Sequence, residues 1–230
     1  MSSDRNNQRV VVTGGSSGLG AAVCRRLGEH GADVISLDRR PSEQAETIET
    51  DLSDTAAAER ATQTAIDRLG GLDALVCCAG TDVPGPFDAT DRETWERIVA
   101  VNLLATAAVS RAALPQLLEQ SGRLVTVAST LGHRAVGDAS AYCASKFGVI
   151  GFTRALAAEY RGRVGVTLLT PGGMHTAFFD ARDEQYKPPP EAVLADPDDV
   201  ADAVVWALDR PAGIEIKELA IMAPAEASWP

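Results

Sequence analysis

A glycine-rich turn directly behind a run of valines constrains the fold of this chain more than any other feature. Three valines at positions 10–12 are typical of a buried strand. After Gly18 the apolar residues recur at steps of four, which predicts a helix carrying Leu19, Val23 and Leu27. A strand, a glycine turn and a helix in this order form a unit that wraps backbone around a phosphate.

Three glycines in this turn have separate expected tasks. Gly14 lets the chain bend, Gly18 lets backbone approach a phosphate, and Gly20 lets the helix pack closely on the strand. The start of the helix adds free N–H groups and a partial positive charge. The stretch therefore predicts a dinucleotide pyrophosphate site, and a purely structural turn is the alternative.

The rest of the chain alternates between strand and helix patterns. We expect further strands at 32–38, 47–52, 72–80, 123–129, 164–169 and 218–222. We expect helices at 54–68, 92–120, 139–160 and 198–209, the second of them capped by Thr90 or Asp91 and kinked near Pro115. This alternation, without repeats or linkers, predicts one α/β domain over residues 1–230: a doubly wound, parallel seven-stranded sheet with helices on both faces.

Composition excludes several classes of protein. A net charge of −11 and a pI near 4.7 argue against binding to nucleic acid or to anionic membranes. The first nine residues are polar, so we expect no signal peptide, and we expect no apolar run of membrane-spanning length. The spacing of the cysteines does not fit a metal site, so we expect reduced, mostly buried thiols in a cytoplasmic protein: Cys24, Cys77, Cys78 and Cys143.

A second constellation combines Ser129, Tyr142 and Lys146. Tyr142 and Lys146 lie four residues apart on a predicted helix and therefore share a face. A free tyrosine has a pKa of about 10, and a lysine ammonium nearby is expected to lower that pKa toward neutrality. Ser129 ends a predicted strand, at the edge where doubly wound sheets bind their ligands. The alternative is an ordinary Tyr/Lys pair on a surface helix.

Taken together, these motifs resemble the short-chain dehydrogenase/reductase family over essentially the whole chain. The family's glycine pattern T-G-x-x-x-G-x-G matches residues 13–20, and its Y-x-x-x-K matches Tyr142 and Lys146. Its serine falls on Ser129, its asparagine on Asn102, and its P-G-x-x-x-T segment on residues 171–176. The acidic pair that holds adenine resembles residues 51–52. The resemblance implies a Rossmann-type fold.

The resemblance also implies hydride transfer between a nicotinamide cofactor and a secondary alcohol or its ketone. Tyr142 is then the general acid or base, Lys146 lowers its pKa and holds the nicotinamide ribose, Ser129 polarises the carbonyl, and Asn102 positions a water. Besides Asn102, Tyr142 and Lys146, the expected cofactor-binding residues are Gly14, Ser16, Ser17, Gly18, Leu19, Gly20, Asp38, Arg39, Asp51, Leu52, Ala79, Gly80, Pro171, Gly172 and Thr176.

One departure from the family pattern stands out. The usual N-N-A-G after the fourth strand is replaced here by residues 77–80, in which Cys77 and Cys78 stand in for the asparagines. Because those asparagines mainly brace the central strands, we expect the change to affect stability and loop geometry more than chemistry. Cys143 follows the tyrosine and is interpreted as a packing residue.

The sequence favours NAD over NADP. Asp38 lies twenty residues after Gly18, where a carboxylate can accept hydrogen bonds from the adenosine ribose and repel a 2′-phosphate. Arg39 acts in the opposite sense, since a guanidinium beside the ribose attracts that phosphate. NADP-preferring relatives often place a second basic residue before the middle glycine, where this chain has Ser17. We therefore expect NAD as the cofactor.

The substrate side is less constrained. Residues 171–197 are expected to form a lid, and the pocket candidates beside Ser129 and Tyr142 are His133, Val136, Met174, Phe178 and Phe179. A stripe of small residues on the tyrosine helix (Ser140, Ala144, Gly148 and Gly151) suits a homodimer or homotetramer, or packing within the chain. A cofactor-sensing regulator and an epimerase or dehydratase on the same scaffold are the alternative functions.

Overall fold

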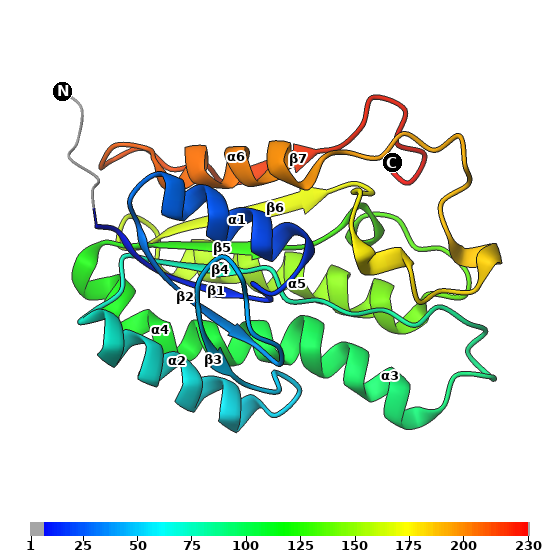
Figure 1. The fold of residues 1–230 in the computed structure, drawn as a ribbon, viewed down its shortest axis with the longest axis horizontal. Coiled ribbons are helices and arrows are strands. Elements are labelled where there is room, and N and C mark those ends of the chain that lie inside the picture. The colour runs from blue at the N-terminus through cyan, green and yellow to red at the C-terminus, as the bar shows by residue number, and fades with distance from the viewer. Residues whose placement is uncertain (1–6, 230) are drawn as a thin grey trace.

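A single parallel sheet forms the centre of the molecule. The computed structural model describes residues 7–229, so the expectation of a signal-free terminus falls mostly on residues outside it. Seven strands pair in the order β3-β2-β1-β4-β5-β6-β7, all parallel, which confirms the predicted doubly wound sheet (Figure 1). The strands are β1 (Arg9–Thr13), β2 (Asp33–Asp38), β3 (Glu46–Glu49), β4 (Ala74–Cys77), β5 (Arg123–Val127), β6 (Gly165–Pro171) and β7 (Glu218–Ile221).

Helices cover both faces of this sheet (Figure 1). They are α1 (Gly18–Glu29), α2 (Thr55–Leu69), α3 (Arg92–Val99), α4 (Ala105–Gln120), α5 (Ser140–Glu159) and α6 (Pro197–Leu208). The valines of β1 alternate between the faces: Val11 packs into the core with α2 and α4, while Val10 and Val12 pack with α1 and α6. Burial on both faces explains the unbroken apolar run in β1.

Several strands end earlier than the sequence predicts. β4 stops at Cys77, opposite Thr13 at the end of β1, and β5 stops at Val127, opposite Leu169 of β6. Beyond the end of β4, the Ala79 N–H donates to Thr13 Oγ1 at 3.1 Å instead of joining the ladder. β3 likewise ends at Glu49 rather than at residue 52. These early endings leave the motif residues in loops at the carboxyl edge of the sheet, where ligands bind doubly wound folds.

The predicted helix 92–120 is continuous but not regular. Asp91 caps it by accepting the Thr94 N–H at 2.8 Å. A π-helical turn, Ala100–Leu104, separates α3 from α4, and α4 then runs through Pro115. By length and composition this helix could cross a membrane, so the expectation that no apolar run is long enough was wrong. In the fold, one face of α4 is instead buried against α2 and the sheet.

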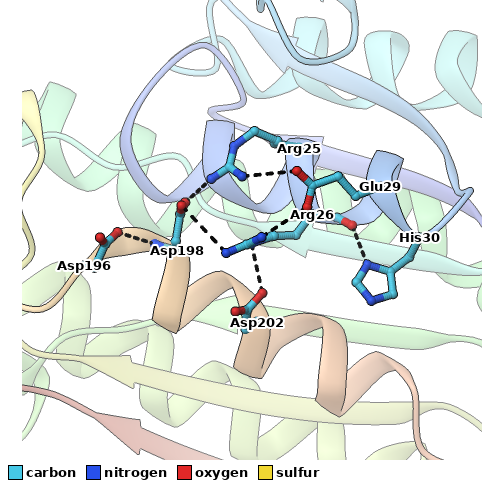
Figure 2. A network of polar contacts seen from close by, with 7 residues as sticks. All are labelled: Arg25, Arg26, Glu29, His30, Asp196, Asp198 and Asp202. Carbon is cyan, nitrogen blue, oxygen red and sulfur yellow. Dashed lines mark hydrogen bonds and ion pairs between the residues drawn. The ribbon is translucent and has the colours of Figure 1, made fainter.

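A polar network fastens α1 to α6 (Figure 2). Arg25 pairs with Asp198, and Arg26 pairs with Asp202 at 2.9 Å. Asp196 caps α6 by accepting the Asp198 N–H at 2.9 Å. Because these side chains are partly exposed, each pair contributes little to stability. Their effect is positional: they hold the start of α6, which follows the segment predicted to be a lid, against the helix that follows the glycine turn.

Candidate active site

The glycine turn adopts the backbone that its sequence predicts. Gly14 and Gly18 have φ values of +76° and +53°, in the left-handed region that side chains disfavour. A Cβ on Gly20 would lie 2.1 Å from the Gly14 carbonyl oxygen, so only glycine lets α1 pack against the turn. The three expected glycine tasks thus have a geometric basis.

The same turn suits a phosphate. Ser16 Oγ is buried and has no hydrogen-bond partner within residues 7–229. Ser17 precedes α1 and provides no side-chain cap, so the first N–H groups of α1 are left for an anion. These orphaned donors fit the pyrophosphate of a dinucleotide, whose negative oxygens they would satisfy.

Asp38 lies beside this turn at the end of β2. Its carboxylate accepts the Ser16 N–H at 3.1 Å and the Arg40 N–H at 3.1 Å, which fixes its orientation. Arg39 is exposed. The Arg40 guanidinium donates to Ser17 Oγ at 3.4 Å, so the cation that stands near the turn is Arg40 rather than the expected Arg39.

The two predicted adenine-side residues lie in different surroundings. Leu52 is buried in the core with α2. The Asp51 carboxylate is exposed, accepts the Ser53 N–H at 2.9 Å and lies 3.6 Å from the Arg97 guanidinium. The hydrogen bond from Ser53 lowers the pKa of Asp51. Asp51 is thus a fixed anion at the rim, whereas Leu52 serves mainly as a packing residue.

The folded chain brings Ser129, Tyr142 and Lys146 together. Ser129 follows β5 and accepts the Leu131 N–H at 3.1 Å. Tyr142 and Lys146 project from the same face of α5, with Lys146 Nζ 5.6 Å from the centre of the Tyr142 ring. Lys146 is only 4% exposed, and its ammonium donates to the Val127 carbonyl at 2.9 Å.

Burial controls both titrations. Loss of solvent raises the pKa of Tyr142 to about 12, although a hydrogen bond with Ser129 acts to lower it. Burial also lowers the pKa of Lys146 to about 8. The expectation that Lys146 lowers the pKa of Tyr142 is therefore not met here, because desolvation of the phenol outweighs the neighbouring charges.

Asn102 occupies the π-helical turn and is almost completely buried. Its side chain accepts the Thr81 N–H at 2.8 Å and donates to the Thr81 carbonyl at 2.9 Å and to Ser145 Oγ at 3.0 Å. These bonds brace the loop after β4. Gly80 lies beside them, since a Cβ there would lie 3.7 Å from both Asn102 Oδ1 and Lys146 Nζ.

The segment after β6 lies over the glycine turn. Its ends are joined by a bridge between Met174 and Ala195. A Cβ on Gly18 would meet the Thr176 side chain at 3.4 Å, which places the predicted Thr176 directly above the turn. Pro171 and Gly172 are buried at the end of β6, with the Gly172 N–H donating to the Ile221 carbonyl at 2.9 Å.

The expected substrate residues are only partly assembled. The Phe178 ring lies 5.9 Å from Tyr142 and 5.5 Å from Phe179. His133 instead contacts Thr170 and the Trp229 ring, and Val136 is exposed. Met174 packs on the core beside α1 and α6. Of the five, Phe178 and Phe179 therefore form the wall next to Tyr142.

Comparison with known proteins decides the family. The model of the short chain dehydrogenase family matches residues 8–187 of the chain. The chain belongs to the short-chain dehydrogenase/reductase family. It is 32% identical over 217 residues to the 2,5-dichloro-2,5-cyclohexadiene-1,4-diol dehydrogenase LinX of Sphingobium indicum, covering 86% of this chain and 87% of that protein.

Solved structures agree with this short-chain dehydrogenase in fold. A short chain dehydrogenase of Burkholderia cenocepacia in complex with NADP is 30% identical with a TM-score of 0.82, covering 95% of this chain and 98% of that one. A 3-ketoacyl-(acyl-carrier-protein) reductase of Brucella melitensis complexed with NADH is 25% identical with a TM-score of 0.81, covering 93% and 96%.

The short-chain dehydrogenase departs from its family's pattern at residues 77–80. All four cysteines are free thiols, as expected, and burial raises the pKa of Cys24 and Cys77 to about 12. Burial also raises the pKa of Cys78 well above its usual range. Cys143 packs with Ile98 and Tyr142, in line with its interpretation as a packing residue.

Two groups of residues at the site of this dehydrogenase were missed from the sequence. Asp82 and Arg182 form an ion pair beside Tyr142, and Glu226 accepts the Gly173 N–H at 2.8 Å from the C-terminal segment. Nothing in their local sequence marks them, because each joins the site through a tertiary contact. Asp82 and Arg182 are 100 residues apart in the sequence, and Gly173 and Glu226 are 53 residues apart, so no local pattern predicts either contact.

Proposed function

We propose that this short-chain dehydrogenase transfers a hydride between a nicotinamide dinucleotide and a secondary alcohol or its ketone. One observation carries the proposal: Tyr142, Lys146 and Ser129 meet at the carboxyl edge of the sheet, next to a glycine turn with unsatisfied donors. When bound there, the nicotinamide supplies or accepts the hydride. The protein must then hold the reacting oxygen and move its proton.

The three side chains divide this work. Tyr142 is protonated at neutral pH because burial keeps its pKa high, so it can donate the phenolic proton to an alkoxide that forms in a reduction. Ser129 is placed to hydrogen-bond the same oxygen. Lys146 is buried on the same helix face, from which its ammonium would bond the nicotinamide ribose and favour the phenolate in the oxidation direction.

For the cofactor we propose NAD in preference to NADP. Asp38 is fixed by two backbone N–H groups beside the glycine turn, where its carboxylate would repel a 2′-phosphate. Arg40 beside Ser17 is the opposing charge. Similar solved structures are in complex with NADP or NADPH more often than with NADH, so the NAD proposal rests on the residues of this chain alone.

The proposed working unit is a single cytoplasmic domain with a lid at 171–197. Phe178 and Phe179 would present apolar surface to the substrate beside Tyr142. Free thiols at all four cysteines support a reducing compartment. LinX acts on a cyclic diol by its name, and a small cyclic alcohol is a reasonable first substrate class for the present chain.

We also propose a homodimer or homotetramer built on α5 and the start of α4. The small-residue stripe is partly covered within the chain, since Gly148 abuts Leu103 and Ser140 accepts the Trp95 indole N–H. Gly151 is open, however, and Phe147 and Leu104 are 46% and 48% exposed. Sedimentation analysis of the parent and of Phe147→Glu tests this, with dissociation expected in the variant.

The function itself is tested by replacing Tyr142. A panel of secondary alcohols and ketones is scored by nicotinamide absorbance with both cofactors. Tyr142→Phe should lose about 100-fold or more of the activity while keeping dinucleotide affinity within a few-fold, because the phenol moves a proton but holds no phosphate. Lys146→Met should lower both the activity and the affinity for the dinucleotide.

Tyr160→Phe, at the other end of the same helix, is the matched control and should keep parent activity. If Tyr142→Phe retains more than roughly a tenth of the parent rate, the general-acid assignment is wrong.

A further inference from the structure

The lid carries a buried ion pair into the neighbourhood of Tyr142. Arg182 Nη2 lies 2.8 Å from Asp82 Oδ2, and the two side chains are 14% and 4% exposed. No other ion pair among residues 7–229 is as well shielded from solvent. Charges in such a place are weakly screened, so they act on neighbouring groups over several ångströms.

An aromatic stack links this pair to the phenol. The Arg182 guanidinium lies 4.9 Å from the Phe178 ring centre and 4.7 Å from that of Phe179. Phe178 in turn lies 5.9 Å from the Tyr142 ring. Arg182 belongs to the lid and Asp82 to the loop after β4, so the pair joins these two segments beside the site.

We propose that Asp82 and Arg182 are positioning residues for proton transfer at Tyr142: the pair joins the lid to the loop after β4, and its opposite charges balance each other at the phenol. The proposal rests on the proposed role of Tyr142. With both charges present, their effects on the phenol largely cancel. Removing either residue leaves the other as an uncompensated charge beside the site, and the phenol responds with a sign that depends on which one remains.

The other groups around the phenol do not reproduce this pattern. Asp82 raises and Arg182 lowers the pKa of Tyr142, after burial as the largest influence. Cys143, the next residue along α5, also raises it, and the hydrogen bond with Ser129 lowers it. Lys146 on the next turn of α5 lies 5.6 Å from the ring centre, and its ammonium is held by the Val127 carbonyl rather than by the lid. Among the groups that act on the phenol, only Asp82 and Arg182 combine opposite charges with a link to the lid, which carries Arg182.

The test uses a readout that does not require turnover. The full chain is labelled with tyrosine carrying ¹³C at Cζ, which gives three resonances from Tyr142, Tyr160 and Tyr186. The Tyr142 signal is assigned by its loss in Tyr142→Phe. Ionisation is followed from pH 8 to pH 11.5, with circular dichroism checking that the fold persists. Tyr160 serves as the internal reference, because Tyr186 lies in the lid.

Opposite responses are expected from the two single substitutions. At a fixed alkaline pH, Asp82→Asn should raise the ratio of ionised to neutral Tyr142 about threefold, and Arg182→Met should lower it about threefold, which corresponds to shifts of about half a pKa unit. The double variant should return to the parent curve. Arg182→Lys keeps the positive charge and should stay near the parent.

Two results would overturn the proposal. A pair that only latches the lid is broken by either substitution, so both single variants would then shift the resonance in the same direction. An unchanged Tyr142 curve in Asp82→Asn would also reject it. If the parent turns over no alcohol or ketone, the proposed function fails, whereas the resonance still reports on the charge balance.

Discussion

The Gly14 carbonyl oxygen lies 2.1 Å from the point that a Cβ on Gly20 would occupy. The first turn of α1 therefore packs directly on the backbone of the glycine loop. The contact keeps the N-terminus of α1 pointing into the loop. The phosphate site requires this orientation, because the free N–H groups of the helix must face the phosphate. A methyl group at Gly20 would force backbone to move rather than a flexible side chain.

Gly20→Ala should therefore lower both stability and cofactor affinity. Overpacking against backbone costs about 1–3 kcal/mol, and a displaced helix start should weaken dinucleotide binding about tenfold or more. Gly28→Ala is the matched control in the same helix, because nothing lies within 4 Å of its added Cβ. We expect Gly28→Ala to be neutral or to stabilise by up to about 1 kcal/mol. Urea unfolding measures the stability of each variant, and fluorescence titration with NADH measures its cofactor affinity. Equal effects of Gly20→Ala and Gly28→Ala would contradict the packing argument.

Lys146 gives protein stability a defined pH dependence. Burial lowers the pKa of Lys146 to about 8, whereas an unfolded lysine titrates at about 10.4. Between these values the unfolded chain holds a proton that the native protein has released, so a rise in pH favours the native state. Below about pH 8 Lys146 is protonated in both the native and the unfolded state, so it adds no pH dependence to the free energy of unfolding.

The free energy of unfolding of the parent, relative to Lys146→Met, should thus increase by about 1–2 kcal/mol between pH 7.5 and pH 9.5. Urea denaturation of both proteins at the two pH values measures it. Taking the difference removes the titrations that the proteins share, such as those of Cys24 and Cys77. A difference that stays constant or falls would show that Lys146 is not held in a desolvated site.

Asp38 should set the cofactor preference. We expect a higher kcat/KM for NAD than for NADP in the parent, and a shift of that ratio toward NADP by about tenfold in Asp38→Ala, because the repulsion of the 2′-phosphate is removed. Asp33→Ala, at the other end of β2, is the control and should leave the ratio unchanged. Parent preference for NADP would reject the NAD proposal, and an unaltered ratio in Asp38→Ala would remove Asp38 as its cause.

The lid should respond to ligands. Amides of residues 174–190 should exchange more slowly when cofactor and substrate are both bound, since closure buries them and preserves the contact of Arg182 with Asp82. Amides of residues 10–13 in β1 provide the reference, because those residues are buried. Hydrogen exchange followed by mass spectrometry measures both regions, and equal exchange with and without ligands would argue against a moving lid.

Much of this protein was determined by its sequence alone. The valines of β1, the glycine spacing and the repeated alternation of strand and helix patterns predicted the parallel sheet and the layers around it. These features are local: a glycine with positive φ, an i,i+4 pair such as Tyr142 and Lys146, or a buried apolar run is specified within a few residues. Ser129 could also be placed correctly, because the end of a strand fixes the edge of the sheet where its side chain lies.

Only the tertiary structure decided the charges and contacts that surround those residues. The pKa of Tyr142 is raised rather than lowered because burial, which no spacing reveals, outweighs its neighbours. The π-helical turn at Asn102 is stabilised by the loop after β4, far away in sequence. Arg182 and Glu226 reach the site across long stretches of chain. Local pattern specifies secondary structure, whereas desolvation and long-range pairing arise only once the chain has packed.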